Sequence, residues 1–265
     1  MASGDLEIRT TIDRLWLETA AREEPALHAY ALWDLDRHPA RVRFVSAVLG
    51  TTTLGYLLLW PLGDGGMIVH WLGDPESTHA LLDRLPPRPL VVIGPEGGGP
   101  AVERLRGPTR VRSVAVEMAA VGVPAPAGAQ DEMVRRLTGD DRPLLERFAA
   151  RQSERAGTAY GGFDPVEEPV WAAFDEGRIV ALARPAVRLP HVWVVSGVYV
   201  EPDRRNQGWG RAVVRAVMVE AARAGAPCGL FVREDSAPAR ALYTALGFRP
   251  VTRRLWIDAG TGRDP

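Results

Sequence analysis

Lysine is missing from this sequence, and its charges nearly balance. All 32 basic residues are arginine and 33 residues are acidic, so the formal net charge is −1. A chain with so little net charge has no general attraction to nucleic acid or to an anionic membrane surface. We interpret the arginine bias as a nucleotide-composition effect of the source genome, and we expect no nucleic-acid partner.

Cysteine and long apolar runs are also scarce. The single cysteine, Cys228, excludes an internal disulfide and is typical of a reducing cytosol; we expect it to pack in the core. The most apolar run, residues 54–62, contains Pro61 and is too short to cross a bilayer. The N-terminus lacks the basic-then-apolar pattern of a signal peptide. These absences predict a cytoplasmic protein without membrane contact.

The length and composition fit a globular protein of one large or two medium domains. The chain has 265 residues, of which 46% are hydrophobic and 25% charged. Residues 120–130 are rich in Ala, Gly and Pro and have no apolar periodicity, which is typical of a semi-rigid linker. We therefore expect a first domain over residues 1–119, the linker over 120–130, and a second domain over 131–265.

The periodicity predicts a similar order of elements in both halves. In the first half we expect helices over 1–20 and 25–35, strands over 41–49, 52–60 and 67–72, a helix over 77–85, and strands over 90–93 and 110–118. In the second half we expect a strand over 133–137, a helix over 140–150, a hairpin of 171–174 and 178–184, a strand over 192–200, a helix over 209–224, a strand over 228–232, and a final helix and strand ending near Trp256. The fold class is thus α/β (α+β), with two tandem units of similar architecture.

Residues 198–211 read as the end of a strand, a loop with two glycines and the start of a helix. The N–H groups of a first helical turn have no partner inside the helix, and the helix dipole adds partial positive charge there. Gly208 and Gly210 let an anion approach the backbone, and Arg205 and Arg211 add formal positive charge. We predict that residues 205–211 hold a pyrophosphate. An ordinary strand-to-helix turn has a similar sequence, so the loop alone does not distinguish a pyrophosphate site from such a turn.

Two motifs extend this pattern. The loop reads R-x-x-G-x-G at 205–210, and S-x-x-A-x-x-L-Y-x-x-x-G-F follows at 236–248, after the strand predicted at 228–232. In this order and spacing the segments resemble the GNAT superfamily of acyl-CoA-dependent N-acyltransferases, and most closely its glycine N-acyltransferase-like branch. The resemblance implies two tandem GNAT-like domains, each with a mixed, mostly antiparallel sheet flanked by helices. It also implies acetyl-CoA as the acyl donor and no metal.

The resemblance further implies how the acyl-CoA is held. Loop N–H groups bind the pyrophosphate, and the strand end, splayed from its neighbour after a bulge, offers backbone donors to the acetyl carbonyl and the pantetheine arm. Ser236 stands where the family usually has Asn, and either residue can cap a helix or bond the cofactor arm. Arg204 and Arg215 are either further contacts or solvated surface charges. The predicted cofactor-binding residues are Val198, Tyr199, Val200, Arg205, Asn206, Gln207, Gly208, Trp209, Gly210, Arg211 and Ser236.

The resemblance assigns Tyr243 as the general acid. Its phenol, with a reference pKa of about 10, can protonate the departing thiolate. The alternative is a core tyrosine on a short helix. The general base stays open, because residues 192–200 contain no carboxylate. Ser196 could only relay a proton through water, Glu201 could face solvent at the strand exit, and His191 fits a surface position. A water chain, or an amine with a lowered pKa, would need no base.

The first half lacks a comparable loop. Residues 73–78 carry two carboxylates and no Gly-x-Gly, so we expect no CoA site there. The glycine-rich residues 94–100 contain no Lys or Arg, and Pro95 and Pro100 remove N–H donors, so we predict a flexible turn.

The leading hypothesis is an N-acyltransferase that moves an acetyl or other short acyl group from CoA to a primary amine of a small molecule or peptide. Residues 157–168 would form a mobile loop over the acceptor, and Trp171, Tyr160 and Phe163 are possible wall residues. Carboxylates in that loop (Asp164, Glu167 and Glu168) would favour a cationic acceptor. The alternative hypothesis is a non-catalytic acyl-CoA-binding or regulatory module, which the missing strand carboxylate favours.

Overall fold

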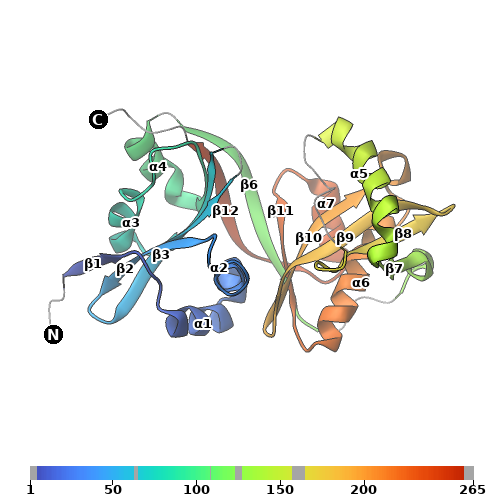
Figure 1. Cartoon of the computed structure of the whole chain (residues 1–265), viewed down its shortest axis with the longest axis horizontal. Coiled ribbons are helices and arrows are strands. Elements are labelled where there is room, and N and C mark those ends of the chain that lie inside the picture. The colour runs from blue at the N-terminus through green and yellow to red at the C-terminus, as the bar shows by residue number, and fades with distance from the viewer. Residues whose placement is uncertain (1–4, 63–64, 108, 123–126, 157–164, 260–265) are drawn as a thin grey trace. The chain divides into compact units, whose positions relative to one another are not determined.

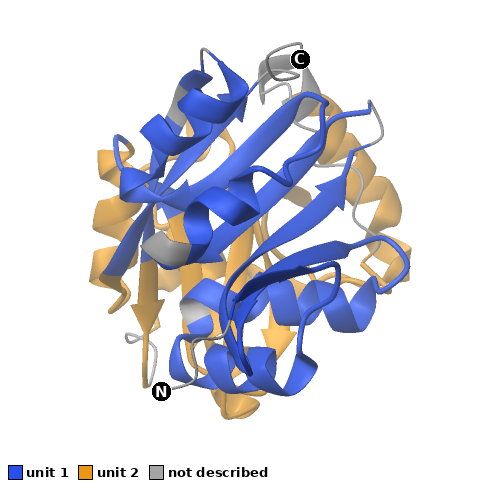
Figure 2. Cartoon of the chain, turned by 90° about the vertical axis from the view of Figure 1, so that its left-hand side faces the viewer, with its two compact units in different colours: residues 1–117, 232–235, 251–265 blue, residues 118–231, 236–250 orange. Residues whose placement is uncertain are grey.

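The chain divides into two compact units (Figure 2). The computed structural model describes residues 5–62, 65–107, 109–122, 127–156 and 165–259. Unit 1 comprises residues 1–117, 232–235 and 251–265, and unit 2 comprises residues 118–231 and 236–250. The C-terminal segment groups with unit 1 because β12 (Arg249–Ala259) pairs antiparallel with β5 (Leu90–Pro95). The sequence had placed this segment in a second domain ending at residue 265.

Unit 1 is a mixed sheet flanked by helices, with the strand order β1-β2-β3-β4-β5-β12-β6. Strands β4 and β5 pair in parallel, while β1–β2, β2–β3, β3–β4 and β5–β12 are antiparallel. The remaining elements are β1 (Leu6–Arg9), α1 (Arg14–Glu23), α2 (Pro25–Arg37), β2 (Arg43–Leu49), β3 (Thr52–Pro61), β4 (Met67–Gly73), α3 (Pro75–Leu82), α4 (Gly99–Arg106) and β6 (Thr109–Ala120).

The prediction of one helix over residues 1–20 was wrong in part. Residues 6–9 form β1 instead, because they pair with β2 from Leu6 opposite Leu49 to Arg9 opposite Ser46. Helix α1 begins only after Asp13, whose carboxylate accepts the Trp16 N–H at 3.0 Å as an N-cap. The helix predicted over 25–35 is present as α2, with Pro25 in its first turn.

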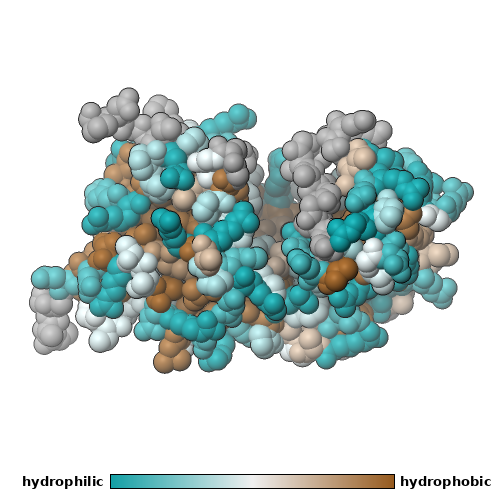
Figure 3. All heavy atoms as spheres, in the orientation of Figure 1, coloured by the Kyte–Doolittle hydropathy of each residue, from teal (hydrophilic) through white to brown (hydrophobic). Residues whose placement is uncertain are grey.

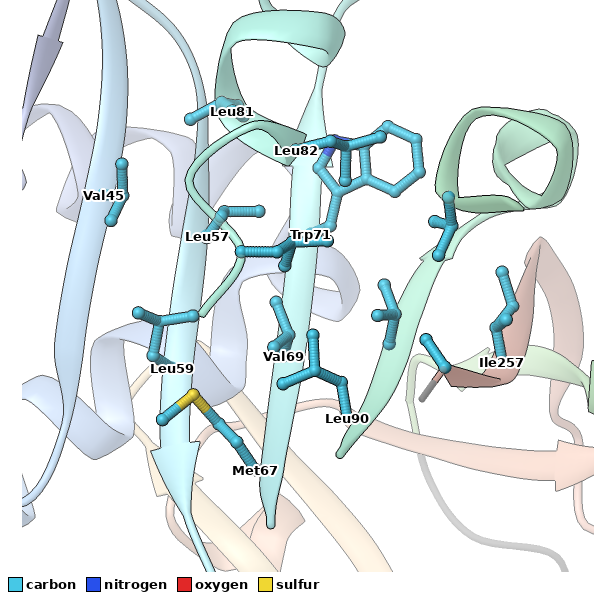
Figure 4. Packing of buried hydrophobic residues seen from close by; sticks show 14 of the residues in the cluster. Val45, Leu57, Leu59, Met67, Val69, Trp71, Leu81, Leu82, Leu90 and Ile257 are labelled. Carbon is cyan, nitrogen blue, oxygen red and sulfur yellow. The ribbon is translucent and has the colours of Figure 1, made fainter. Parts of the chain in front are cut away.

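The main core of unit 1 surrounds Trp71 (Figure 4). The Trp71 side chain, 1% exposed, lies beside Leu82 of α3. A Cβ built on Gly94 would lie 2.6 Å from the Trp71 ring, and one on Gly98 only 2.3 Å from it. Residues 94–100 are therefore not a flexible turn: they end β5, form a 3-10 turn over Glu96–Gly98 and start α4. Their glycines make room for an indole ring.

A methyl group at Gly98 is expected to destabilise the fold. Gly98→Ala places a carbon inside the contact distance of the Trp71 ring, and overpacking of this kind costs about 1–3 kcal/mol. Gly97→Ala is the matched control, because a Cβ there meets nothing within 4 Å. Urea denaturation of both variants measures the difference; equal free energies of unfolding would contradict this account of the glycines.

The strands of unit 2 follow one another in the sheet in the order β11-β10-β9-β8-β7. Strands β10 and β11 are parallel, and the other neighbours are antiparallel. Helix α5 packs its apolar side, including Phe148, on one face of the sheet (Figure 1), while α6 contacts β8, β9 and β10. The elements are β7 (Val134–Arg136), α5 (Arg142–Ala156), β8 (Trp171–Asp175), β9 (Arg178–Leu189), β10 (Val192–Val200), α6 (Trp209–Arg223), β11 (Cys228–Arg233) and α7 (Ala237–Ala245).

The structure thus confirms the α/β (α+β) class and the mixed sheet flanked by helices. The hairpin predicted around residues 175–177 is the β8–β9 turn, where Glu176 and Gly177 both have positive φ. Cys228 is 4% exposed, and burial raises the pKa of its thiol to about 12. A thiol of that kind packs in a core and is not a nucleophile at neutral pH.

Candidate functional site

Strand β10 changes partners halfway along its length. It pairs in parallel with β11 only from Trp193 opposite Cys228 to Val195 opposite Leu230. Beyond that point it continues to Val200 beside β9, with a register shift between Ser196 and Tyr199. Gly197 lies in this bulge with φ +60°, a backbone region that favours glycine. The bulge that the resemblance implies is therefore present, and the parallel pairing ends where backbone donors are needed.

The loop after β10 is held in a tight conformation. Asn206 and Gly208 both have positive φ, and Gly208 is the N-cap of α6. The Gln207 amide donates to the Asp203 carbonyl at 3.1 Å, and the Trp209 indole N–H donates to Gln207 Oε1 at 3.4 Å. The N-cap residue Gly208 has no side chain that could cap α6, which suits the binding of an anion by the N–H groups of the first turn. Residues 205–208 are exposed, as such a role requires.

Both glycines of the loop lie against neighbouring side chains. A Cβ on Gly208 would lie 2.9 Å from Oε1 of Gln130, and one on Gly210 would lie 3.2 Å from Val200 Cγ2. Gly210 is also close to Leu242, the residue before Tyr243, because its Cβ would lie 3.4 Å from Leu242 Cδ2. The loop, the end of β10 and α7 therefore converge at the N-terminus of α6.

The arginines near the loop have specific partners. Arg205 donates from Nε to the Val200 carbonyl at 3.3 Å, and its guanidinium lies 6.0 Å from the Tyr199 ring centre. Arg204 and Arg215 are ion-paired and not solvated surface charges: Arg204 pairs with Asp175 at 2.9 Å, and Arg215 with Asp131 at 2.6 Å.

The end of the predicted linker borders the loop. Asp131 Oδ1 accepts the Gly128 N–H at 3.0 Å, while its other oxygen binds Arg215 in α6. A Cβ on Gly128 would lie 3.1 Å from Arg211 Nη1, so the Arg211 side chain runs along this turn. Residues 127–131 are thus anchored to α6, which the composition of the segment did not predict; residues 123–126 lie outside the described residues.

Tyr243 lies in α7 and is 7% exposed. Its ring contacts Phe248 edge-on, with 5.9 Å between the ring centres. Ser236 is the N-cap of α7, but its hydroxyl makes no capping hydrogen bond. The side chain of Ser236 is only partly buried, which leaves the hydroxyl accessible to a cofactor arm.

Glu201 is not a solvent-facing carboxylate, which corrects one of the alternatives for the base. It is 4% exposed; Oε1 accepts from Arg151 Nε at 2.9 Å, and Oε2 lies 3.6 Å from Arg178 Nη1. Arg151 also donates to the Ile179 carbonyl, so the carboxylate ties α5 and β9 to the exit of β10. Both oxygens of the carboxylate are therefore engaged by arginine side chains. The sequence does not reveal this, because Arg151 is 50 residues away.

Loss of the Glu201 carboxylate should destabilise unit 2. Glu201→Ala leaves Arg151 and Arg178 without their buried partner, and we expect a cost of about 1–3 kcal/mol in the free energy of unfolding. Asp203→Asn is the control, since Asp203 is exposed and reaches Arg178 only at 3.5 Å; exposed pairs contribute less than about 1 kcal/mol. Chemical denaturation that finds Asp203→Asn as harmful as Glu201→Ala would contradict the assignment.

The predicted acceptor residues are only partly within the described ranges. Tyr160, Phe163 and Asp164 lie outside them. Trp171 is 7% exposed in β8, with Arg136 6.0 Å from its ring centre. Glu168 binds Arg184 at 2.8 Å, so its charge is already matched. Arg184 stands opposite Ser196 in the β9–β10 register, beside the bulge.

A separate open cavity of about 550 Å³ lies in unit 1 and is lined by residues that include Thr10, Ile12, Phe44 and Leu59. Figure 3 shows apolar residues at the surface over β2 and β3. None of the predicted site residues lines this cavity. Over the described residues, no group of three His, Cys, Asp or Glu side chains could hold a metal, and no helix is long and apolar enough to cross a membrane.

Comparisons with known proteins agree with this geometry. The sequence profile of the GNAT acetyltransferase family matches residues 133–248. A ribosomal protein bS18-alanine N-acetyltransferase of Escherichia coli (strain K12) is 36% identical over 119 residues, which cover 44% of this chain and 72% of the relative. The chain therefore belongs to the GNAT family, whose members are acetyl-CoA-dependent acetyltransferases acting on amines.

Solved structures extend the likeness in fold to nearly the whole chain. A Drosophila protein superposes with a TM-score of 0.67 at 14% identity, over 97% of this chain and 99% of that one. A tandem GNAT protein from the clavulanic acid biosynthesis pathway superposes with a TM-score of 0.55 at 15% identity, over 98% of this chain and 100% of the other.

Proposed function

We propose that this chain transfers an acetyl or other short acyl group from CoA to a primary amine, and that residues 131–265 carry the site. The observation that carries the proposal is the junction of β10 and α6. There, a bulged strand that has left its parallel partner leads into the N-terminus of α6, whose N-cap is a glycine. Such a junction supplies backbone donors to a thioester carbonyl and to a pyrophosphate.

The residues divide into three roles. Residues 205–210 offer N–H groups to the pyrophosphate, with Arg205 and Arg211 beside them. The end of β10 offers backbone donors to the thioester carbonyl and to the pantetheine arm. Ser236 hydrogen-bonds the pantetheine arm as well. Bound acetyl-CoA supplies the activated acyl carbon. An amine nitrogen attacks that carbon and releases a proton to water, the C–S bond breaks, and Tyr243 donates its phenolic proton to the thiolate that leaves. Water then returns a proton to Tyr243. We assign no base, because Glu201 is held by arginines and Ser196 can only relay through water.

We also propose a tandem arrangement in which the half over residues 1–119 binds no CoA and residues 120–130 link it to the second. In unit 1, β4 pairs with β5 only from Met67 to His70, and the Trp71 indole follows at the point where the two strands stop pairing. An indole that fills the core there leaves no room for a pantetheine arm. The intact loop and tyrosine motif support membership of the glycine N-acyltransferase-like branch.

The acceptor class is a primary amine of a small molecule or peptide. The relative that acetylates an alanine of a ribosomal protein supports a peptide N-terminus as one acceptor. An acetylation screen with peptides starting in alanine, free amino acids and polyamines tests this, with release of the CoA thiol as the readout. Thiol release stimulated by at least one amine class supports the proposal; acetyl-CoA binding without transfer to any amine supports the alternative, a non-catalytic acyl-CoA-binding module.

A further inference from the structure

The unit 1 sheet carries polar residues on the face opposite the Trp71 core. Leu57, Val69, Leu255 and Ile257 belong to that core, and side chains alternate along a strand. Their sequence neighbours therefore point to the other face. These neighbours are Tyr56 of β3, His70 of β4, and Arg254 and Trp256 of β12, and they are joined there by His28 of α2 and Glu117 of β6.

The registers and contacts bring these residues together. His70 and Trp256 both stand opposite Ile93, so they lie in one row across β4, β5 and β12. His28 Nδ1 lies 3.0 Å from the Tyr56 hydroxyl, and the rings of Tyr30 and His70 are 5.6 Å apart. Arg254 acts electrostatically on His28, His70, Tyr56 and Glu117, which places its guanidinium at the centre of the group.

The two charged members of this group are deeply buried. Arg254 and Glu117 are each 2% exposed, and Tyr56 is fully buried. Burying a charge is costly unless it is paired and hydrogen-bonded. A core that needed only packing would hold apolar residues at these positions, so these polar groups need partners of their own.

Three polar atoms in this group lack a partner within the described part of the chain: Arg254 Nη2, Glu117 Oε2 and Trp256 Nε1. Arginine and tryptophan nitrogens can only donate. A carboxylic acid oxygen donates as well when it carries a proton. The group thus presents unused donors, and native proteins seldom leave buried donors unused.

The charge balance favours an anion. Burial raises the pKa of Glu117 to about 7, although Arg254 opposes the shift. Burial, and secondly the Arg254 charge, lower the pKa of His28 to about 4 and that of His70 to about 3, so both rings are neutral at neutral pH. Burial also raises the pKa of Tyr56, so no anion comes from this phenol. Arg254 therefore has at most a partly ionised Glu117 as its counter-charge.

We propose that this face of unit 1 binds the carboxylate group of a small ligand through Arg254 Nη2 and Trp256 Nε1, with Glu117 Oε2 as a third contact. A carboxylate has two oxygens and about four acceptor positions, which suits three donors. The site is distinct from the β10–α6 junction and does not depend on acetyl transfer. The competing explanation is ordered water, which would satisfy the same atoms but would not discriminate by charge.

Thermal unfolding with added acetate tests the proposal, with acetamide and sodium chloride as controls. Acetamide has the shape of acetate without its charge. We expect acetate to raise the Tm saturably, and neither control to match it. We further expect the acetate effect to weaken as the pH rises above about 7, because Glu117 then loses the proton it must donate. An equal response to acetamide, or no response to acetate beyond that of sodium chloride, would overturn the proposal.

Two variants locate the effect. Trp256→Phe keeps an aromatic side chain but removes the indole N–H, and the loss of one hydrogen bond to an anion should weaken the apparent acetate affinity roughly tenfold. Arg254→Met should abolish the response, while Arg253→Met, which changes the exposed arginine next to it in the same strand, should keep it. If Arg254→Met fails to fold, Trp256→Phe still tests the site. An apparent acetate affinity equal to that of the wild type would refute it. A response that persists in Gly208→Glu, a change in the loop of unit 2, separates this site from the acetyl-CoA site.

Discussion

Gly208→Glu is expected to abolish acetyl-CoA binding, with a loss of affinity of at least a hundredfold. Three effects act together. Gly208 has φ +88°, where an L-residue is strained by about 1–2 kcal/mol. Its Cβ would lie 2.9 Å from Gln130 Oε1. The new carboxylate would also stand at the helix terminus where we propose that the pyrophosphate binds, and like charges so close repel. Isothermal titration calorimetry measures the loss directly.

Gly225→Glu is the matched control for this variant. Gly225 follows the other end of α6, has φ +75° and has nothing within 4 Å of a Cβ. It carries the same backbone strain and the same charge change without touching the loop. We expect Gly225→Glu to lower stability by about 1–2 kcal/mol and to leave the dissociation constant unchanged. If both variants lost binding equally, general destabilisation and not the loop would be the cause.

Tyr243→Phe should lower turnover by about 10²- to 10⁴-fold while acetyl-CoA affinity changes little. General acid catalysis contributes a factor of that size, and the change removes only the phenolic oxygen. The ring contact with Phe248 is kept, so the fold should persist. Thr244→Val, an exposed change in the same helix, serves as the control and should keep wild-type kcat. Initial rates and calorimetry together separate the effects. A wild-type kcat in Tyr243→Phe would remove Tyr243 from the mechanism.

The sequence predicted best what depends on local geometry. The turn at Glu176 and Gly177, the loop from Arg205 to Gly210 and the start of α6 are set by positive-φ positions and the apolar face of one helix, all within a few residues. The same locality let Tyr243 be placed on a short helix. These features needed no knowledge of distant partners.

What the sequence did not predict depends on contacts between distant residues. The pairing of β12 with β5 joins segments about 160 residues apart in a way that no local pattern encodes. The burial of Glu201 depends on its ion pair with Arg151. Gly94 and Gly98 are needed because a larger side chain at either position would meet the Trp71 ring. The sequence did not distinguish Arg254 from the other arginines, because its burial depends on the fold.

Calorimetric titration of the wild-type chain with acetyl-CoA tests the central claim most directly, because it reports both binding and stoichiometry. The account predicts saturable binding of one acetyl-CoA per chain, at the β10–α6 junction. Saturation at a hundredfold excess over the dissociation constant should also stabilise the fold by about 2.7 kcal/mol. An absence of binding would contradict the cofactor site, and two equivalents per chain would contradict the proposal that Trp71 closes the first half to CoA.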